Sequence, residues 1–264
     1  MCIRDRPYSH LAGIEKAAID VQLLSPRPNQ MMHSHKSGKV VRYFTQICNN
    51  LIYRHTQLWP EKFVGIAGLP QIAGEPLDAA VQELERCVTE LGFKGCMFNP
   101  DPFENSGSSA PPLWDHYWYP LFEKLCELNV PCHIHGMGPK SDREFYNHYY
   151  VDEVSIAVLA FAGSHVLDDF PGLKVIASHG GGSVPYQIGR YIAGARKNER
   201  RELGPKFGRI YYDTVLHDAS AVEFLINVMG ADNVLFGTEW PGLCLLYTSP
   251  SPRDLSTSRM PSSA

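Results

Sequence analysis

KVIASHGGGSVPYQIGRYIAGARK, residues 174–197, contains a strand signal, a turn signal and a helix signal in direct succession. Residues 174–178 form a short apolar, β-branched run, which is typical of a buried strand. His179 and three glycines follow, and glycine allows the backbone to turn sharply with a positive φ. Apolar residues then recur with helical spacing, and Pro185 suits the first turn of a helix. The stretch therefore predicts a strand that turns directly into a helix.

The same alternation extends through most of the chain. Strand-like runs occupy residues 20–25, 63–69, 93–98, 130–135, 174–178, 209–213 and 233–238. Helical periodicity occupies residues 40–58, 77–91, 113–128, 154–170, 184–197 and 219–228. Such alternation predicts an α/β fold of parallel strands with crossover helices, and both a doubly wound sheet and a (β/α)8 barrel satisfy it. Seven strands, and no G-x-G-x-x-G after the first, favour a TIM barrel that lacks a piece.

Composition limits the class of protein. The chain has 264 residues, 44% of them hydrophobic, and a formal net charge of −4. This charge gives no electrostatic footprint for nucleic acid or an anionic membrane, so small molecules are the expected partners. The seven cysteines include no C-x-x-C pair, which argues against a disulfide scaffold and a zinc finger. Neither a membrane span nor a secretory signal is recognisable, so we expect a cytoplasmic protein, with a homo-oligomer left open.

The two ends of the chain differ from the middle. The opening MCIRDR and the closing CLLYTSPSPRDLSTSRMPSSA resemble translated sequencing-adapter ends. The closing run is rich in Ser, Pro, Thr and Arg and cannot form a core, so a natural disordered tail is the alternative. We expect residues 1–6 to be a non-native extension, 7–243 a barrel fragment and 244–264 a non-native disordered tail.

Ionisable side chains follow three of the predicted strands. His133 and His135 end one strand, His179 ends the next, and Glu239 ends the last. His133 and His135 are two residues apart, so they share one face of a strand and can reach one centre. Imidazole and carboxylate are good ligands for zinc or manganese. The sequence therefore predicts a shared site at the carboxyl ends of the strands, where barrels of this kind place their chemistry.

Two further strand ends carry polar side chains. Arg27 and Asn99 follow the runs at residues 20–25 and 93–98, respectively. A guanidinium at such a position can bind a substrate carboxylate through two hydrogen bonds. Asp213 ends another strand, where it can either bond to the site or cap a turn.

The motifs resemble a known family. VPCHIHGMG, FPGLKVIASHGGGSVPYQIGR and DNVLFGTEWPG, with LLSPRP and GCMFNPDP upstream, are similar to the amidohydrolase superfamily branch that holds aminocarboxymuconate semialdehyde decarboxylase and 4-oxalomesaconate hydratase. The match runs over residues 19–242. Glu239, where Asp is commoner in the branch, and the segment PPLWDHYWYPLFEK resemble the hydratase more closely.

The resemblance implies a distorted (β/α)8 barrel with one divalent metal, usually zinc, with manganese as the alternative. It implies that His135 is a metal ligand, that His179 is an acid/base catalyst and that Glu239 lies beside the metal. His133 matches no ligand of the family and is expected to line the substrate site. The resemblance places Arg27 against the substrate, and Tyr149 resembles a substrate-binding tyrosine of the hydratase.

One part of the family pattern is missing. The family begins with a strand that ends in His-x-His and supplies two metal ligands, and no such strand precedes residue 20. His33 and His35 have the right spacing, but they follow a Pro/Asn-rich loop rather than an opening strand. We therefore expect a truncated start, weak metal binding and impaired activity in this fragment.

Three reactions fit this expected site. The first is hydration of the C=C bond of a small dicarboxylate or tricarboxylate, with Glu239 taking a proton from water and His179 protonating carbon. The second is decarboxylation of a muconate or hydroxybenzoate-type acid, in which the metal stabilises developing negative charge. The third is hydrolysis of a lactone or amide. Glu239 favours hydration, and an interaction scaffold without catalysis has no support beyond the missing His-x-His.

Overall fold

The computed structural model describes the central part of the chain. The described residues are 7–35, 37–104, 106–138, 143–145, 148–198 and 202–239. The expected non-native segments, 1–6 and 244–264, lie outside them, and their origin stays a prediction. Within the described ranges, no helix is long and apolar enough to cross a membrane.

Each of the seven predicted strand runs contains a parallel strand. The strands are β1 (Gln22–Leu24), β2 (Phe63–Gly65), β3 (Cys96–Phe98), β4 (Cys132–Ile134), β5 (Val175–Ala177), β6 (Ile210–Asp213) and β7 (Val234–Leu235). β1 pairs with β2, and β3 to β7 form a sheet in chain order. A parallel bridge between Ala67 and Cys96 joins the two sets. Neighbours therefore follow the chain order throughout, as in a barrel, whereas a doubly wound sheet reverses its order once.

The first and last strands approach each other at their carboxyl ends. Arg27 follows β1 and Glu239 follows β7, and the guanidinium lies 3.7 Å from the carboxylate. Two groups on opposite ends of a seven-strand array can meet only if the array curves round. The strand order and this contact confirm the predicted barrel type, although the described residues include no backbone pairing between β1 and β7.

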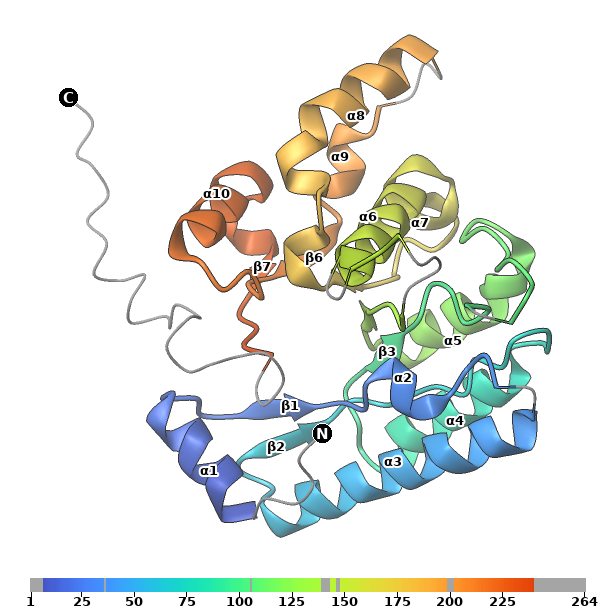
Figure 1. The fold of residues 1–264 in the computed structure, drawn as a ribbon, viewed down its shortest axis with the longest axis vertical. Helices are drawn as coiled ribbons and strands as arrows, with labels where there is room; N and C mark the ends of the chain where they lie inside the picture. The colour runs from blue at the N-terminus through green and yellow to red at the C-terminus, as the bar shows by residue number, and fades with distance from the viewer. Residues whose placement is uncertain are drawn as a thin grey trace.

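Helices follow the strands where the periodicity predicts them (Figure 1). The predicted helices are α3 (Gly38–Leu58), α4 (Asp78–Thr89), α5 (Tyr119–Leu128), α6 (His148–Gly163), α8 (Val184–Asn198) and α10 (Ala219–Met229). The predicted helix over 154–170 ends early and is followed by a separate turn of helix, α7 (Val166–Asp169). The periodicity did not reveal α1 (Pro7–Lys16), α2 (Pro28–Met31) or α9 (Gly204–Phe207).

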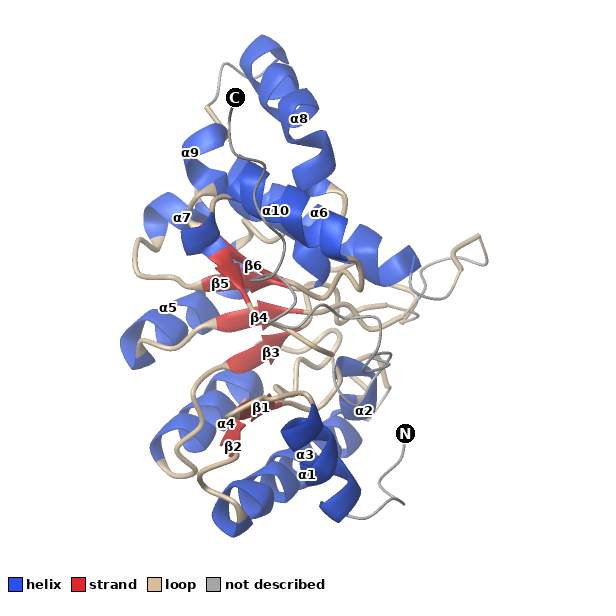
Figure 2. Ribbon diagram, turned by 90° about the vertical axis from the view of Figure 1, so that its left-hand side faces the viewer, coloured by secondary structure: helices blue, strands red, loops and turns tan. Residues whose placement is uncertain are grey.

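Aromatic side chains fill the space between β3 and the helices outside it. The ring of Phe98 on β3 lies 5.3 Å from that of Trp118, 6.1 Å from Phe122 and 6.3 Å from Phe161. All four side chains are fully buried. They lie on the helix-facing side of the sheet, whose strands are seen side by side in Figure 2. This packing holds α5 and α6 against β3, and so helps to fix the carboxyl end of that strand.

A buried polar network joins the ends of the first three strands. His33, in the turn after α2, has Nε2 2.7 Å from the Leu69 carbonyl and Nδ1 3.0 Å from the Asn99 amide. Gln71 exchanges two hydrogen bonds with the Asn99 backbone, at 2.7 and 2.9 Å. Because the Asn99 Oδ1 accepts from the Asp101 amide, its Nδ2 must donate to His33. His33 is therefore a neutral imidazole whose Nε2–H donates to Leu69.

This network predicts a specific acid sensitivity. Burial lowers the pKa of His33 from 6.5 to about 4. Below pH 6.5 His33 becomes protonated in the unfolded chain but stays neutral in the folded chain. The free energy of unfolding therefore decreases as the pH is lowered, and it levels off near the folded pKa. Between pH 7.5 and 5 this group should cost about 2 kcal/mol of unfolding free energy. In urea unfolding experiments, the free energy of unfolding of His33→Gln should change between pH 7.5 and 5 by about 2 kcal/mol less than that of the wild type. The exposed control His35→Gln should behave as the wild type, and an unchanged pH slope in His33→Gln would refute the assignment.

Candidate functional site

Two histidines from neighbouring strands form the centre of the site. His135 follows β4 and His179 follows β5, and their ring centroids are 5.4 Å apart in an edge-to-face arrangement. β4 and β5 are parallel neighbours in the sheet, so their carboxyl ends lie side by side. The Nδ1 of His135 lies 2.6 Å from the carbonyl of Gly136, which makes Nδ1 the protonated nitrogen and leaves the lone pair on Nε2. His179 Nε2 is buried without a hydrogen-bond partner among the described residues.

The turn that carries His179 is left-handed. His179 has φ 52°, and Gly180, Gly181 and Gly182 also have positive φ. A Cβ on Gly181 would lie 2.6 Å from the ring of Tyr212, so this position also requires glycine for space. The Gly180 amide donates to Asp213 Oδ1 at 3.1 Å. The three glycines are therefore required by the backbone path, and Asp213 fixes that path.

Glu239 lies between two basic side chains. Its Oε2 is 3.2 Å from Nε2 of His217, and its Oε1 is 3.7 Å from Arg27. The negative charge of Glu239 also acts to raise the pKa of His179, against the effect of burial. The structure thus places His135 beside His179, and Glu239 beside Arg27. Their convergence in one catalytic site stays a prediction. The sequence reasoning missed His217, whose signal was a histidine four residues beyond a predicted strand.

Burial controls the protonation of this group of side chains. Burial, reinforced by the nearby charges of His179, His133 and Arg27, lowers the pKa of His135 to about 3. Burial also lowers the pKa of His179, while the negative charges of Asp213 and Glu239 act in the opposite direction. Burial tends to raise the pKa of Asp213, but hydrogen bonding and positive charge from His133 outweigh it and lower the pKa. At neutral pH the centre therefore holds neutral imidazoles beside an ionised Asp213.

His133 is held by two neighbours. Its Nε2 lies 3.0 Å from Ser178 Oγ and 3.5 Å from Asp213 Oδ2. The Ser178 hydroxyl donates to the Ile134 carbonyl, so its oxygen accepts from His133. Nε2 is therefore the protonated nitrogen, and the His133 side chain, 32% exposed, lies beside the centre formed by His135 and His179. Asp213, which the sequence left without a role, binds both this imidazole and the His179 turn.

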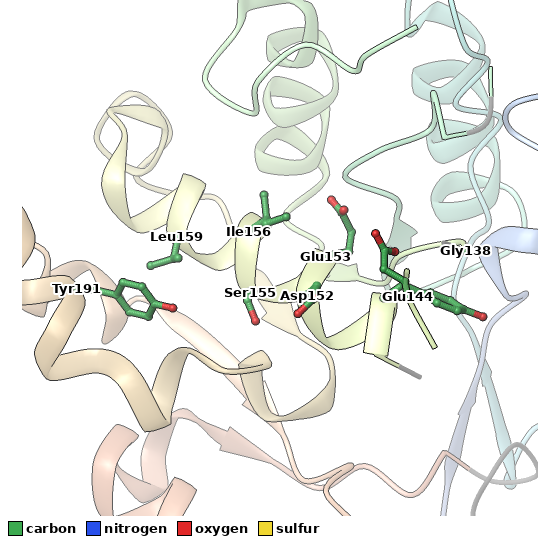
Figure 3. A pocket seen from close by; sticks show the side chains of 9 residues that line it. Gly138, Glu144, Asp152, Glu153, Ser155, Ile156, Leu159 and Tyr191 are labelled. Atoms are coloured by element: carbon green, nitrogen blue, oxygen red, sulfur yellow. The ribbon is translucent and has the colours of Figure 1, made fainter. Parts of the chain in front are cut away.

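The two tyrosines at the start of α6 take different positions. The ring of Tyr150 lies 5.1 Å from that of His135 and 6.2 Å from that of His179. Tyr149 instead lines a separate cavity of about 350 Å³, whose other lining residues include Glu144, Asp152, Glu153 and Tyr191 (Figure 3). Tyr149 therefore borders an acidic cavity, and its expected substrate role stays a prediction. Tyr150 is the tyrosine whose ring lies next to both histidines.

Asn99 belongs to the buried network rather than to the centre. Its side chain is bonded to His33 and to the Asp101 amide, and the residue is 1% exposed. The substrate-binding role expected for Asn99 stays a prediction. His33 has both ring nitrogens bonded inside the protein.

A family model described as amidohydrolase matches residues 3–249. The chain belongs to the amidohydrolase family.

This amidohydrolase resembles hydratases and decarboxylases. It is 36% identical over 236 residues to a 2-keto-4-carboxy-3-hexenedioate hydratase of a Sphingobium species, covering 89% of this chain and 69% of that protein. It is 30% identical to a gamma-resorcylate decarboxylase of a Polaromonas species, covering 86% of this chain and 74% of that protein. The crystal structure of 4-oxalomesaconate hydratase from Rhodopseudomonas palustris matches with a TM-score of 0.79 and 32% identity, covering 93% of this chain and 69% of that one. These relatives support a lyase.

A fourth match shares the fold and holds a metal. The structure of a dihydroxybenzoic acid decarboxylase from Polaromonas, with bound manganese and 2-nitroresorcinol, matches with a TM-score of 0.79 at 24% identity. It covers 96% of this chain and 82% of that one.

Two side chains of this amidohydrolase carry donor atoms of the kinds that divalent metals bind. The Nε2 lone pair of His135 and the carboxylate of Glu239 are groups that zinc and manganese bind. Protein metal sites usually supply three or four such ligands. Over the described ranges, no three His, Cys, Asp or Glu side chains are placed to hold an ion. His135 and Glu239 thus fit a metal in kind but do not form a full set of ligands.

The small number of protein donors predicts weak metal binding by this chain. Two protein ligands leave an ion largely hydrated, so calorimetric titration with Zn²⁺ or Mn²⁺ should give a Kd weaker than about 1 μM. His135→Ala should weaken it further, whereas His165→Ala, at an exposed position just before α7, should not. Nanomolar binding that is lost in His135→Ala would contradict this expectation and show that other residues of the chain complete the ligand set.

Proposed function

We propose that this amidohydrolase is a hydratase that adds water across the C=C bond of a small unsaturated di- or tricarboxylate. The observation that carries the proposal is Glu239, a carboxylate held at the carboxyl end of β7 between His217 and Arg27. Such a group can both accept a proton from water and lie next to a bound substrate carboxylate. The two hydratases among the matched proteins, at 36% and 32% identity, support the same reaction.

Each side chain has a distinct role in this proposal. Arg27, with 42% of its side chain exposed, would bind a substrate carboxylate while remaining near Glu239. Glu239 accepts the proton of the attacking water, and His217 orients its carboxylate through Oε2. His179 delivers a proton to the adjacent carbon. His133 and Tyr150 lie beside the two central histidines and shape the space for the substrate.

A divalent cation held by His135 and Glu239 would lower the pKa of the attacking water. The burial that lowers the pKa of His135 to about 3 keeps its imidazole neutral, as a metal ligand must be. The manganese in the Polaromonas decarboxylase structure supports a divalent ion, and zinc is the alternative.

A decarboxylase is the second candidate. Its support is the 30% identity to a gamma-resorcylate decarboxylase. In that reaction the C–CO2 bond breaks and a proton replaces the carboxylate, for which His179 is again a suitable donor. A hydrolase on the same scaffold would need the same activated water.

The hydratase proposal predicts large losses of rate at two positions. With 4-oxalomesaconate as substrate and excess Mn²⁺ or Zn²⁺, Glu239→Gln and His179→Asn should each lower kcat by ~10²- to 10⁴-fold, because each removes a proton-transfer group. Circular dichroism should show both variants folded. The matched controls Glu223→Gln and His165→Asn, at exposed positions on α10 and before α7, should retain full activity. Normal turnover in either site variant would exclude its proposed role.

Isotope labelling separates the two reactions. In ¹⁸O water a hydratase places one label in the new hydroxyl group and releases no CO2. The label must be located by fragmentation in the mass spectrometer, because ketone oxygens exchange with water without an enzyme. CO2 release from 2,6-dihydroxybenzoate, with no labelled hydroxyl formed from 4-oxalomesaconate, would replace the proposed hydratase with the decarboxylase.

A further inference from the structure

The outer face of α3 carries an apolar stripe along its whole length. Val40, Phe44, Ile47, Leu51 and Leu58 are spaced by three and four residues, with Arg54 in the one remaining position of the pattern. At 3.6 residues per turn, these six positions lie within about 40° of one line along the helix. Phe44, Ile47, Leu51 and Leu58 are 42%, 37%, 48% and 66% exposed. Scattered exposed apolar residues are normal, but an aligned row of this length is not.

α3 cannot rotate to bury this stripe. Its opposite face, with Gly38, Val41, Thr45 and Asn49, is buried against the rest of the protein. The Asn49 amide donates to the Gly68 carbonyl at 3.0 Å and accepts from the Gly68 amide at 2.8 Å. A rotation of the helix would break both bonds. α3 runs along the outer edge of the molecule, with β2 and α4 on its inner side (Figure 1).

The spacing is that of a coiled-coil seam. Apolar residues that alternate by three and four along a helix pack into the gaps of a second helix. The positions that flank the seam carry Tyr43, Asn50 and Gln57 on one side and Cys48 and His55 on the other. None of these is a carboxylate, a lysine or an arginine, so two copies of this face meet without repulsion between like charges.

We propose that a second copy of this chain docks on the stripe, with the two α3 helices antiparallel about a two-fold axis. The stripe is symmetric about residue 49 in sequence. In this arrangement Ile47 faces Leu51 of the second copy, Val40 faces Leu58, and Phe44 faces Arg54. The guanidinium of Arg54 then lies over an aromatic ring, which is a favourable cation–π contact. A parallel pair would place Arg54 against its own copy, so repulsion disfavours it.

Sedimentation velocity on the full chain tests whether the apolar stripe of α3 mediates dimerisation. The wild type should be a dimer at micromolar concentration, and Ile47→Glu should dissociate at least about a hundredfold more readily, because it buries an unpaired charge in the seam. Ile47→Ser provides a milder variant whose folding circular dichroism can confirm. The control Tyr186→Glu, at a 78% exposed aromatic on α8, should remain dimeric. A monomeric wild type, or a dimer that survives both Ile47 substitutions, would overturn the proposal.

Cysteine cross-linking tests the orientation. In a Cys48→Ser background, a chain with Ile47→Cys should cross-link to one with Leu51→Cys when the two are mixed under mild oxidation. Each chain alone should cross-link much less, and the background chain sets the level due to the native cysteines. Cross-linking of each chain to itself, without the mixed product, would show a parallel pair and refute the antiparallel arrangement.

Discussion

Parallel pairing in chain order is the constraint on which the rest of this structure depends. Because β1 to β7 all run the same way, the segments that follow them emerge on one side of the molecule. Arg27, His135, His179 and Glu239 each follow a different strand, and the sheet alone brings them to one region. The contact of Arg27 with Glu239 at 3.7 Å then joins the two ends of the array. The placement of the ionisable side chains and the curvature of the barrel thus depend on the same parallel strand pairing.

Burial then determines which ionisable groups near the site are charged. An imidazole surrounded by protein loses its hydration, so His135 and His179 are kept neutral. Asp213 is buried as well, yet it stays ionised because it accepts hydrogen bonds from the Gly180 and Val215 amides and faces His133. One carboxylate therefore holds the glycine turn, orients His133 and supplies the local negative charge.

The sequence predicted what depends on local patterns. All seven strands and the main helices were found, since period-two and period-3.6 signals are properties of short windows. The positions of His135, His179 and Glu239 beyond the ends of parallel strands followed from the same alternation of strand and helix signals. The network of His33 and Asn99 could not be found in this way, because its members are 66 residues apart in the chain. His217 left only a weak signal beyond a predicted strand, because it reaches Glu239 through a turn at φ 57° that no short window specifies.

The choice between Tyr149 and Tyr150 shows the same limit. Both stand in the first turn of α6, and adjacent residues on a helix point about 100° apart. A shift of one residue therefore moves a phenol from the histidines to the acidic cavity. Sequence similarity alone does not fix such a register, because the two tyrosines are adjacent and of the same type.

In the proposed hydration His179 donates a proton, although burial lowers its pKa and leaves only a minor fraction of the imidazole protonated at neutral pH. The charge of Glu239 adjusts the acidity of that protonated fraction. In the resting site the negative charges of Asp213 and Glu239 favour the protonated imidazole and partly offset burial. When Glu239 takes a proton from water it becomes neutral, and one of these two supports is lost. His179 then becomes a stronger acid at the moment when the adjacent carbon needs its proton. In the reverse reaction, loss of the proton from Glu239 restores the charge and makes His179 a stronger base. A carboxylate and an imidazole in electrostatic contact, but not hydrogen-bonded to each other, can in this way serve both directions of a reversible hydration.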